Sequence, residues 1–542
     1  MTDTRLSHAG EMPGPDLPTS VPRQSILAVL IAIWRRHEDL LGGASSLVAT
    51  TGVTSAMGFA YWALAARLFS QRAVGYGSAA ISAMALLGTI GMFGLGTVLI
   101  GELPRRRPRV GLVGAALLAC GLGSLLLGLG FAVVAPLVSG RFGEVGSAPG
   151  RAALFSAGVA LTGIGLVFDQ ATIGLSRGGL QLSRNLVFTA VKLLVLPATA
   201  FILHDELGVG IILAWVVGIA VSMVATAVRL WFSGSPVLAR PDWRVLRGLG
   251  RTAVAHNWLN LAIAVPWSLI PVLVTVVVGP SASAAFYAAW TLTSFLYVVP
   301  THLSTVLFAV ASADPQIIAR KLRFTLLLSA LIGLPGMAIL GLGAHLALSM
   351  FGPGYARAAT LPLWLLVIGY LPSVPRVHYI AVCRAAGKIS RAAFVLTTFA
   401  VMEVAAAAAG GASAGLNGLS FALLAVFLVE GVATAPAVLG TAAGHGRHRL
   451  GDSLTASPDY LAGNTRARGR LPGGAENYLS KRDRQEAGIA ALQSLAESAA
   501  LSAFPFPRCP PGCRLSPPLG ARESAPGATN RPIRPDHRAR TE

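Results

Sequence analysis

The basic residues of this chain fall into every second gap between apolar stretches, from about residue 44 to residue 440. Four of these gaps hold clusters of arginine and lysine: Arg105, Arg106, Arg107 and Arg109; Arg240, Arg244, Arg247 and Arg251; Arg320, Lys321 and Arg323; Arg384, Lys388 and Arg391. The gaps between them, such as Gly279–Ser283 and Gly410–Gly415, carry almost no charge. Because translocating Lys or Arg across a bilayer is costly, this alternation predicts a polytopic membrane protein whose basic loops are cytoplasmic.

The composition agrees with a membrane protein and excludes an ordinary soluble domain. Of 542 residues, 54% are hydrophobic and only 12% are charged, and the mean hydropathy is +0.65. The formal net charge of +20 lies largely in short loops, where it sets orientation and faces anionic lipid headgroups. No basic patch is interleaved with aromatic residues, so no nucleic-acid partner is expected.

The four cysteines predict neither a disulfide framework nor a metal site. Cys120 and Cys383 lie within apolar stretches, where a free thiol behaves as a small hydrophobic group. Cys509 and Cys513 are spaced C-x3-C without a second pair, whereas a structural zinc site needs four ligands. We therefore expect no metal and no cofactor.

A helix needs about 20 apolar residues to cross the hydrocarbon core. The chain contains about twelve such stretches, which predict an all-α fold with about twelve transmembrane helices at 44–67, 75–100, 111–138, 152–175, 180–203, 207–231, 252–278, 284–311, 324–350, 358–382, 392–410 and 416–440. With a cytoplasmic N-terminus, the inner gaps hold about four times as many basic residues as the outer gaps. Both termini are therefore predicted to be cytoplasmic in a multi-pass protein of the plasma membrane.

The spans divide into two groups of six at the longest internal polar segment. The predicted organisation is a cytoplasmic N-terminal segment, a first six-helix bundle, a cytoplasmic linker, a second six-helix bundle and a disordered cytoplasmic tail, at 1–43, 44–232, 233–251, 252–440 and 441–542. The apolar run Ile26–Trp34 is too short to span a bilayer and precedes its basic residues, so it is not read as a signal peptide.

A weak internal repeat supports this division. The segment from Leu68 to Ala79 and the segment from Val278 to Ala288 share one layout: an apolar helix end, a tight turn of small residues, and a helix that opens with small residues. Two equal halves are common among alternating-access transporters.

Several segments resemble polysaccharide flippases of the multidrug/oligosaccharidyl-lipid/polysaccharide exporter superfamily. The first-helix signature of that family resembles two runs of this chain, Ala65–Ser70 and Val74–Ala79. Its eighth helix is similar to the segment from Ala284–Trp290 through Pro300 and Leu307-Phe308. The loop before its tenth helix resembles Gly352–Tyr355. The resemblance covers about residues 40–440. It implies two six-helix bundles around a central cavity, and transport of lipid-linked sugars or, in the multidrug branch, of small cations.

A carrier of an anionic, sugar-bearing lipid needs polar or charged groups within its spans. Lys192 lies in mid-span and is the first candidate to contact substrate, with an ion pair to Asp169 as the structural alternative. Arg376 lies between two prolines and is the second candidate, although it fits a position at the cytoplasmic helix end equally well. The polar group His256, Asn257 and Asn260 opens the seventh span and suits either a cavity wall or a helix–helix contact.

Intramembrane carboxylates can bind a proton or a sodium ion and so couple transport to a gradient. Asp169 and Glu403 are the candidates for this role, and Glu430 ranks below them because it lies nearer a predicted helix end. Pro266 and Pro271 would kink the seventh span and are candidate hinge residues. The cation Arg67 is interpreted as a surface side chain that snorkels to the headgroups.

Together with these residues, the resemblance implies a non-enzymatic flippase that moves a polyprenyl-diphosphate-linked oligosaccharide for cell-surface polysaccharide synthesis. Its expected partners are the lipid-linked sugar, membrane lipids, H⁺ or Na⁺ as coupling ion, and glycosyltransferases as functional neighbours. The main alternative is a cation-coupled multidrug antiporter of the same superfamily. A glycosyltransferase, a polymerase or a lipid II flippase fits less well. The chain has no Walker A, G-x-S-x-G or H-E-x-x-H sequence, so ATP-driven pumping by this chain is not expected.

Overall fold

The structure is a computed structural model that describes residues 38–103, 110–140, 146–175, 177–203, 208–233, 241–313 and 315–444. Within these ranges the chain forms helices joined by short turns and contains no strand. Almost all of the predicted N-terminal segment and C-terminal tail lie outside the described residues, so those two assignments stay predictions.

The first half of the chain contains seven helices in its described residues, five of which are long and apolar enough to cross a membrane. Its helices are α2 (Glu38–Leu68), α3 (Gln71–Gly91), α4 (Leu95–Glu102), α5 (Val110–Val138), α7 (Pro149–Gly174), α8 (Gly178–Ile202) and α9 (Val209–Phe232). The predicted span 75–100 is divided between α3 and α4 because Phe93 and Gly94 adopt left-handed backbone angles, with φ of 49° and 72°.

The second half of the chain also consists of helices in its described residues, some of them broken. Its helices are α10 (Trp243–Val277), α11 (Pro280–Ala313), α12 (Ile318–Leu342), α13 (Ala344–Ser349), α14 (Pro353–Ile368), α15 (Tyr370–Ala385) and α16 (Ile389–Ala442), with a short 3-10 turn at Pro315–Ile317. Helix α10 begins at Trp243, inside the predicted linker, and α14 and α15 form one span bent by 47° around Gly369.

Helix α16 is a hairpin of two limbs rather than one long rod. Helical backbone angles are lost at Ala414 and Gly415, and Gly415 has a φ of +59°, which favours glycine. On either side of this turn, Gly410 and Gly418 approach so closely that a Cβ atom on either residue would overlap the carbonyl of the other. The break therefore falls where the uncharged gap predicted it, and the two limbs carry Glu403 and Glu430 side by side.

Most of these helices are long and apolar enough to cross a membrane. Nine helices of the described part meet this criterion, and the bent pair α14–α15 makes ten. The hairpin α16 counts once among them although it has two limbs, and α2 adds a helix of 31 residues. The predicted all-α polytopic membrane fold is confirmed.

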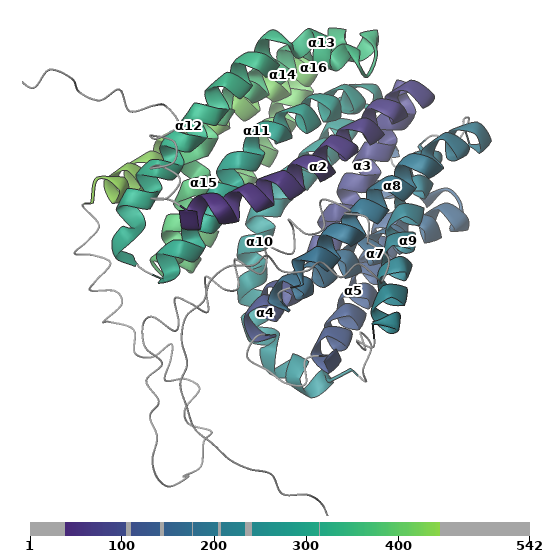
Figure 1. Cartoon of the computed structure of the whole chain (residues 1–542). Helices are drawn as coiled ribbons and strands as arrows, with labels where there is room; N and C mark the ends of the chain where they lie inside the picture. Colours follow the sequence, from purple (N-terminus) through teal and green to yellow (C-terminus); the bar gives the residue numbers. More distant parts are fainter. Residues whose placement is uncertain are drawn as a thin grey trace, which may run out of the picture. The chain divides into compact units, whose positions relative to one another are not determined.

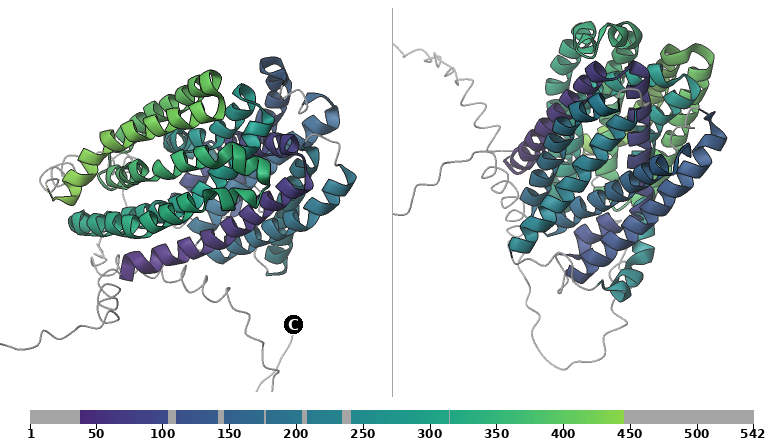
Figure 2. Two further views of the ribbon diagram at one scale, coloured as in Figure 1. Left: turned by 90° about the horizontal axis from the view of Figure 1, so that it is seen from above. Right: turned by 90° about the vertical axis from the view of Figure 1, so that its right-hand side faces the viewer.

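The helices of each half pack mainly with one another, and a few helices join the halves. In the first half α5 packs on α7 and α8 on α9, whereas in the second half α10 and α15 pack on α16 (Figure 1). Across the halves α3 contacts α10 and α11, and α2 runs between α8 and α11. Figure 2 shows the purple helix α2 beside the first-half helices from two further directions.

The two turns of the weak repeat lie against each other. Gln71 Nε2 donates a hydrogen bond to the Ser281 carbonyl at 3.1 Å, and Gly75 of α3 touches the backbone of Pro280 of α11. Beside them, Arg67 Nε donates to the Met350 carbonyl at 3.0 Å. Arg67 thus binds the end of α13 instead of only snorkelling, and these contacts tie the halves together at the predicted outer side.

Candidate functional site

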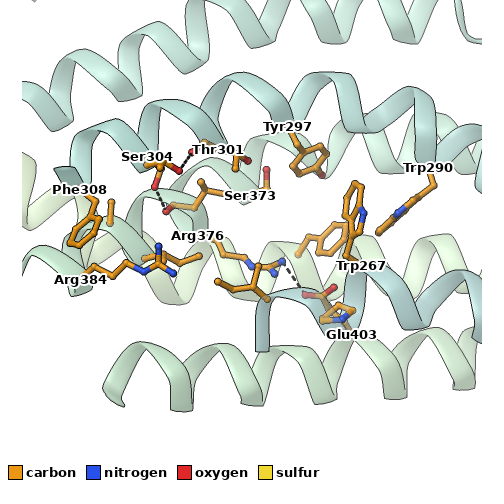
Figure 3. Close-up of a pocket in the computed structure, with 17 residues that line it drawn as sticks. Trp267, Trp290, Tyr297, Thr301, Ser304, Phe308, Ser373, Arg376, Arg384 and Glu403 are labelled. Atoms are coloured by element: carbon orange, nitrogen blue, oxygen red, sulfur yellow. Dashed lines mark hydrogen bonds and ion pairs between the residues drawn. The ribbon is translucent and has the colours of Figure 1, made fainter. Parts of the chain in front are cut away.

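A cavity of about 260 Å³ lies in the second half of the chain, between α10, α11, α15 and α16 (Figure 3). Its wall is formed by residues of all four helices: Ile263, Pro266 and Trp267; Trp290, Tyr297, Thr301, Ser304, Thr305 and Phe308; Ser373, Arg376, Val377, Ile380, Ala381 and Arg384; Glu403 and Phe427. Five aromatic side chains, five hydroxyl groups (that of Tyr297 included), two guanidinium groups and one carboxylate therefore line one cavity.

The middle of the cavity is occupied by an ion cluster. Nη1 of Arg376 donates a hydrogen bond to Glu403 Oε1 and another to Glu430 Oε2, each at 3.0 Å. Both carboxylates are nearly inaccessible, with 2% and 1% of their side chains exposed, whereas 18% of the Arg376 side chain is exposed. Glu430 Oε1 is buried and has no hydrogen-bond partner among the described residues. One cation is therefore shared by two carboxylates.

The prolines of α15 and a glycine of α16 make this cluster possible. Gly431 lies so close to Pro372 that an added Cβ atom would come within 2.6 Å of the proline Cβ. This close approach of two helices places Arg376, one turn after Pro372, next to Glu430. The sequence signal is a small residue beside a carboxylate on one helix and a proline four residues before the arginine on the other.

A second arginine lies at one end of the cavity. The guanidinium carbon of Arg384 is 5.9 Å from the centre of the Phe308 ring. Among the described residues, no carboxylate forms an ion pair with Arg384. Its donors therefore remain available to an anion, and a planar guanidinium can bind a phosphate through two parallel hydrogen bonds.

The other end of the cavity is aromatic. The Trp267 and Trp290 rings lie 4.7 Å apart, and Trp267 is 46% exposed. Trp290 Nε1 is buried and has no hydrogen-bond acceptor among the described residues. Figure 3 places this end opposite Arg384, with Arg376 and Glu403 between the two ends. Aromatic rings with an unused N–H donor can pack on an apolar ligand face and bind its hydroxyl groups.

Hydroxyl side chains line the wall between the two ends. The Ser304 hydroxyl donates to the Val377 carbonyl at 2.8 Å, and the Ser373 hydroxyl donates to the Tyr370 carbonyl at 2.7 Å. Each hydroxyl oxygen retains lone pairs as acceptors. In the described part of the chain no group of three or more His, Cys, Asp or Glu side chains could hold a metal ion.

Three of the predicted site residues meet at this cavity. Arg376 and Glu403 form the ion cluster, and Pro266 contributes to the wall. Pro271 lies one and a half turns further along α10, where its carbonyl accepts a hydrogen bond from the Ser283 hydroxyl at 3.1 Å. This contact links α10 to α11 at the second proline, and α10 continues through both prolines to Val277.

Lys192 lies elsewhere, inside an aromatic cage of the first half. Its Nζ lies 4.0 Å from the ring centre of Trp215, 4.4 Å from Phe188 and 4.8 Å from Tyr61, and only 3% of the residue is exposed. No carboxylate of the described residues pairs with it. Stacked π faces can stabilise a desolvated ammonium by about 2 kcal/mol or more.

The remaining polar candidates form contacts within and between helices. Asp169 does not pair with Lys192 but with Arg184, which donates from Nε at 2.9 Å and from Nη2 at 2.6 Å. Asn260 Nδ2 donates to Thr97 Oγ1 of α4 at 2.8 Å, which joins the halves. Asn257 Oδ1 is buried without a partner in the described part of the chain, and the side chain of His256 lies outside the described residues.

The sequence analysis ranks Glu430 below Asp169 and Glu403 and does not predict Arg384 or the tryptophan pair as site residues. Arg384 was assigned to the cytoplasmic loops because it stands in a cluster of basic residues, yet it closes the α15 helix at the cavity end. Glu430 was ranked low for its position, yet it is among the least exposed carboxylates described. Trp267 follows Pro266 directly, and this proline–tryptophan pair within a span is the signal that could have indicated it.

No protein-family model and no curated protein sequence matches the chain. Solved structures do match. An inward-facing conformation of a multidrug resistance MATE family transporter of the MOP superfamily is similar with a TM-score of 0.57 and 14% identity, over 74% of this chain and 96% of that one. An outward-facing conformation of such a transporter matches with a TM-score of 0.52 and 16% identity, over 77% and 96%.

A third similar structure is a MOP superfamily transporter from Pyrococcus furiosus, described as having a binding pocket of reverse polarity. It matches with a TM-score of 0.51 and 16% identity, over 77% of this chain and 96% of that one. Identities this low carry an argument about fold but not about substrate. The described helices of this chain are therefore arranged in the fold of MATE transporters of the MOP superfamily.

Proposed function

We propose that this protein is an alternating-access transporter that moves a polyprenyl-diphosphate-linked oligosaccharide across the plasma membrane, with both termini in the cytoplasm. The observation that carries the proposal is a cavity with Arg384, which has no carboxylate partner among the described residues, at one end and the Trp267–Trp290 pair at the other (Figure 3). An anionic diphosphate fits the first end, and a sugar ring fits the second.

The physical problem of such a substrate favours this arrangement. The diphosphate and the sugar are polar, so both must leave the hydrocarbon while the lipid tail remains in it. A guanidinium at the end of a cavity, whose donors have no acceptor among the described residues, can bind such an anion through charge-assisted hydrogen bonds. The hydroxyl groups of Ser304 and Thr305 add acceptors and donors for sugar hydroxyls.

The proposal is tested with the purified full chain in liposomes. The probe is a fluorescent short-chain polyprenyl-diphosphate N-acetylglucosamine, and the readout is its transfer between leaflets. We expect Arg384→Gln to lower the initial rate by about tenfold or more, since a charge-assisted hydrogen bond contributes about 1.5–3 kcal/mol. Arg357→Gln, an exposed arginine of α14 outside the cavity wall, is the matched control and should keep the rate. Equal rates for Arg384→Gln and the parent chain would contradict the proposal.

One observation favours a second candidate, an antiporter of cationic small molecules. Glu403 lines the same cavity near Trp267, and a carboxylate beside aromatic rings suits an organic cation. The two candidates differ in the charge of the ligand that the protein moves: the flippase moves an anion and the antiporter moves a cation. Movement of a permanently cationic dye, unaffected by Arg384→Gln and abolished by Glu403→Gln, would establish the antiporter instead.

A further inference from the structure

The ion cluster at the cavity contains one more acidic group than it has cations. Arg376 uses a single nitrogen, Nη1, for both Glu403 and Glu430. Its Nε and Nη2 have no acceptor among the described residues, although Arg376 forms part of the cavity wall. The guanidinium therefore faces two glutamates on one edge and has unused donors on the others.

Among the described residues, no cation other than Arg376 forms an ion pair with Glu403 or Glu430. The helices packed against α16, together with α11, present these further titratable or charged side chains: Tyr287, Tyr297 and His302 from α11; Tyr370, His378, Tyr379, Cys383 and Arg384 from α15; Arg320, Lys321 and Arg323 from α12; Tyr355 and Arg357 from α14; and Arg244 and Arg247 from α10. Tyr297 interacts electrostatically with Arg376 and both glutamates, and a phenol adds no positive charge. In the described part of the chain, Glu430 Oε1 is left buried without a hydrogen-bond partner.

We propose that substrate phosphate and a proton bind cooperatively at this cluster, because Arg376 is shared between the substrate and the Glu403–Glu430 pair. This inference rests on the proposed function and specifies its energy coupling. When the free donors of Arg376 bind a phosphate, the arginine compensates the two glutamates less. Two carboxylates on one cation cannot both stay charged without cost, so one takes up a proton. Linkage is reciprocal, hence protonation also strengthens phosphate binding.

The sign of this linkage follows from charge and does not depend on the direction of transport. An anionic ligand and a proton attract each other through the cluster, whereas a cationic ligand would compete with the proton for the same carboxylates. A proton is favoured over a sodium ion because a proton needs one oxygen atom. No third acid of the described residues joins Glu403 and Glu430 to complete a metal-ion shell.

The test is calorimetric binding of short-chain polyprenyl-diphosphate N-acetylglucosamine to the detergent-solubilised full chain. Both phosphates of this probe are esterified or bridged, so the probe itself does not titrate near neutral pH. Repeating the titration in buffers with different ionisation enthalpies counts the protons taken up on binding. We expect a net uptake of up to about one proton, and an affinity that tightens as pH falls by at most about tenfold per unit.

The variants separate linkage from folding. Glu430→Gln carries the neutral side chain permanently, so it should bind the probe at least as tightly as the parent chain at neutral pH, without proton uptake and with a flat pH profile. Glu403→Gln should behave in the same way, and a melting curve of each variant verifies that it is folded. Arg357→Gln should retain the full proton uptake of the parent chain.

The possible failures are distinguishable. If the parent chain does not bind the probe, the proposed function is wrong, and the cooperative binding of phosphate and proton that rests on it is wrong as well. If it binds without proton uptake, or if affinity falls as pH falls, the linkage is wrong while the proposed function stands. If the affinity instead depends on Na⁺ at constant pH and no proton is taken up, the inference that the coupled ion is a proton is wrong.

Discussion

At the scale of single residues, the two halves hold their buried cations in different ways. Arg184 forms a two-point ion pair with Asp169 in the first half, while Arg376 is shared by two glutamates in the second. The ammonium group of Lys192 lies among three aromatic rings and has no carboxylate partner among the described residues. A paired cation mainly supports the fold, whereas a cation with spare donors at a cavity can bind a ligand. A structural cation and a ligand-binding cation are therefore distinguished by whether hydrogen-bond donors remain unused, and not by burial alone.

The Asp169–Arg184 pair gives a prediction about stability. Arg184→Gln leaves a buried carboxylate without its cation, which should lower the free energy of unfolding by about 3–5 kcal/mol. The double variant Arg184→Gln with Asp169→Asn removes both charges and should recover most of that loss. Thermal melting of the purified protein measures both. A double variant as unstable as the single one would show that the pair is not the source of the effect.

At the scale of helices, breaks in the spans position the cavity. Gly415 reverses the chain so that both limbs of α16 face α15, and the 47° bend at Gly369 turns α15 toward them. Close packing without a side chain at Gly431 then brings Arg376 within hydrogen-bond distance of Glu430. Irregular backbone at membrane depth is tolerated where protein covers it or where it lines a polar cavity.

Gly431→Ala should separate α15 from the second limb of α16. The added Cβ atom would meet Pro372, whose ring and backbone cannot move aside as a flexible side chain would. We expect the free energy of unfolding to fall by about 1–3 kcal/mol, as for other overpacked cores. Gly440→Ala, on the same limb with no atom near its Cβ position, is the control and should melt like the parent chain. Equal melting temperatures for the two variants would contradict the close-packing argument.

At the scale of the whole membrane unit, the halves meet through the repeated turns. Gln71, Gly75 and Arg67 of the first half bind backbone groups of α11 and α13 in the second. These contacts lie on the predicted outer side. For transport by alternating access they must break when the protein opens to that side, so their strength sets the balance between the two states.

Gly75→Ala tests this balance. Its Cβ atom would overlap the Pro280 carbonyl, so the variant should favour the state in which the two turns are apart. Spin labels at Arg72 on α3 and Arg357 on α14, both exposed, report the separation of the halves. We expect a shift of the distance distribution toward longer values. Gly58→Ala on α2 has no atom near its Cβ position and should leave the distribution unchanged. An unchanged distribution for Gly75→Ala would contradict a role for this contact.

Several features followed from the sequence alone because they depend on local physics. Apolar runs of spanning length predicted the helices, and the uncharged gap before Leu416 predicted the turn that makes α16 a hairpin. The charge of Arg376 and Glu403 within spans marked both as functional candidates, because an ionised group in hydrocarbon is costly wherever it lies. These inferences need only the order of residues along one helix.

Only the tertiary structure decided which charges meet. Lys192, which is buried, and Asp169, which is partly buried, lie 23 residues apart, yet Lys192 lies among aromatic rings and Asp169 binds Arg184. Glu430 joins Arg376 because α16 folds back and Gly431 admits Pro372. Which side chains share a cavity depends on helix rotation and crossing, and these are set by packing between distant segments. The position of a charged residue along the chain therefore indicated that placing it in the membrane costs free energy. The packing of the helices determined which neighbouring side chains offset that cost.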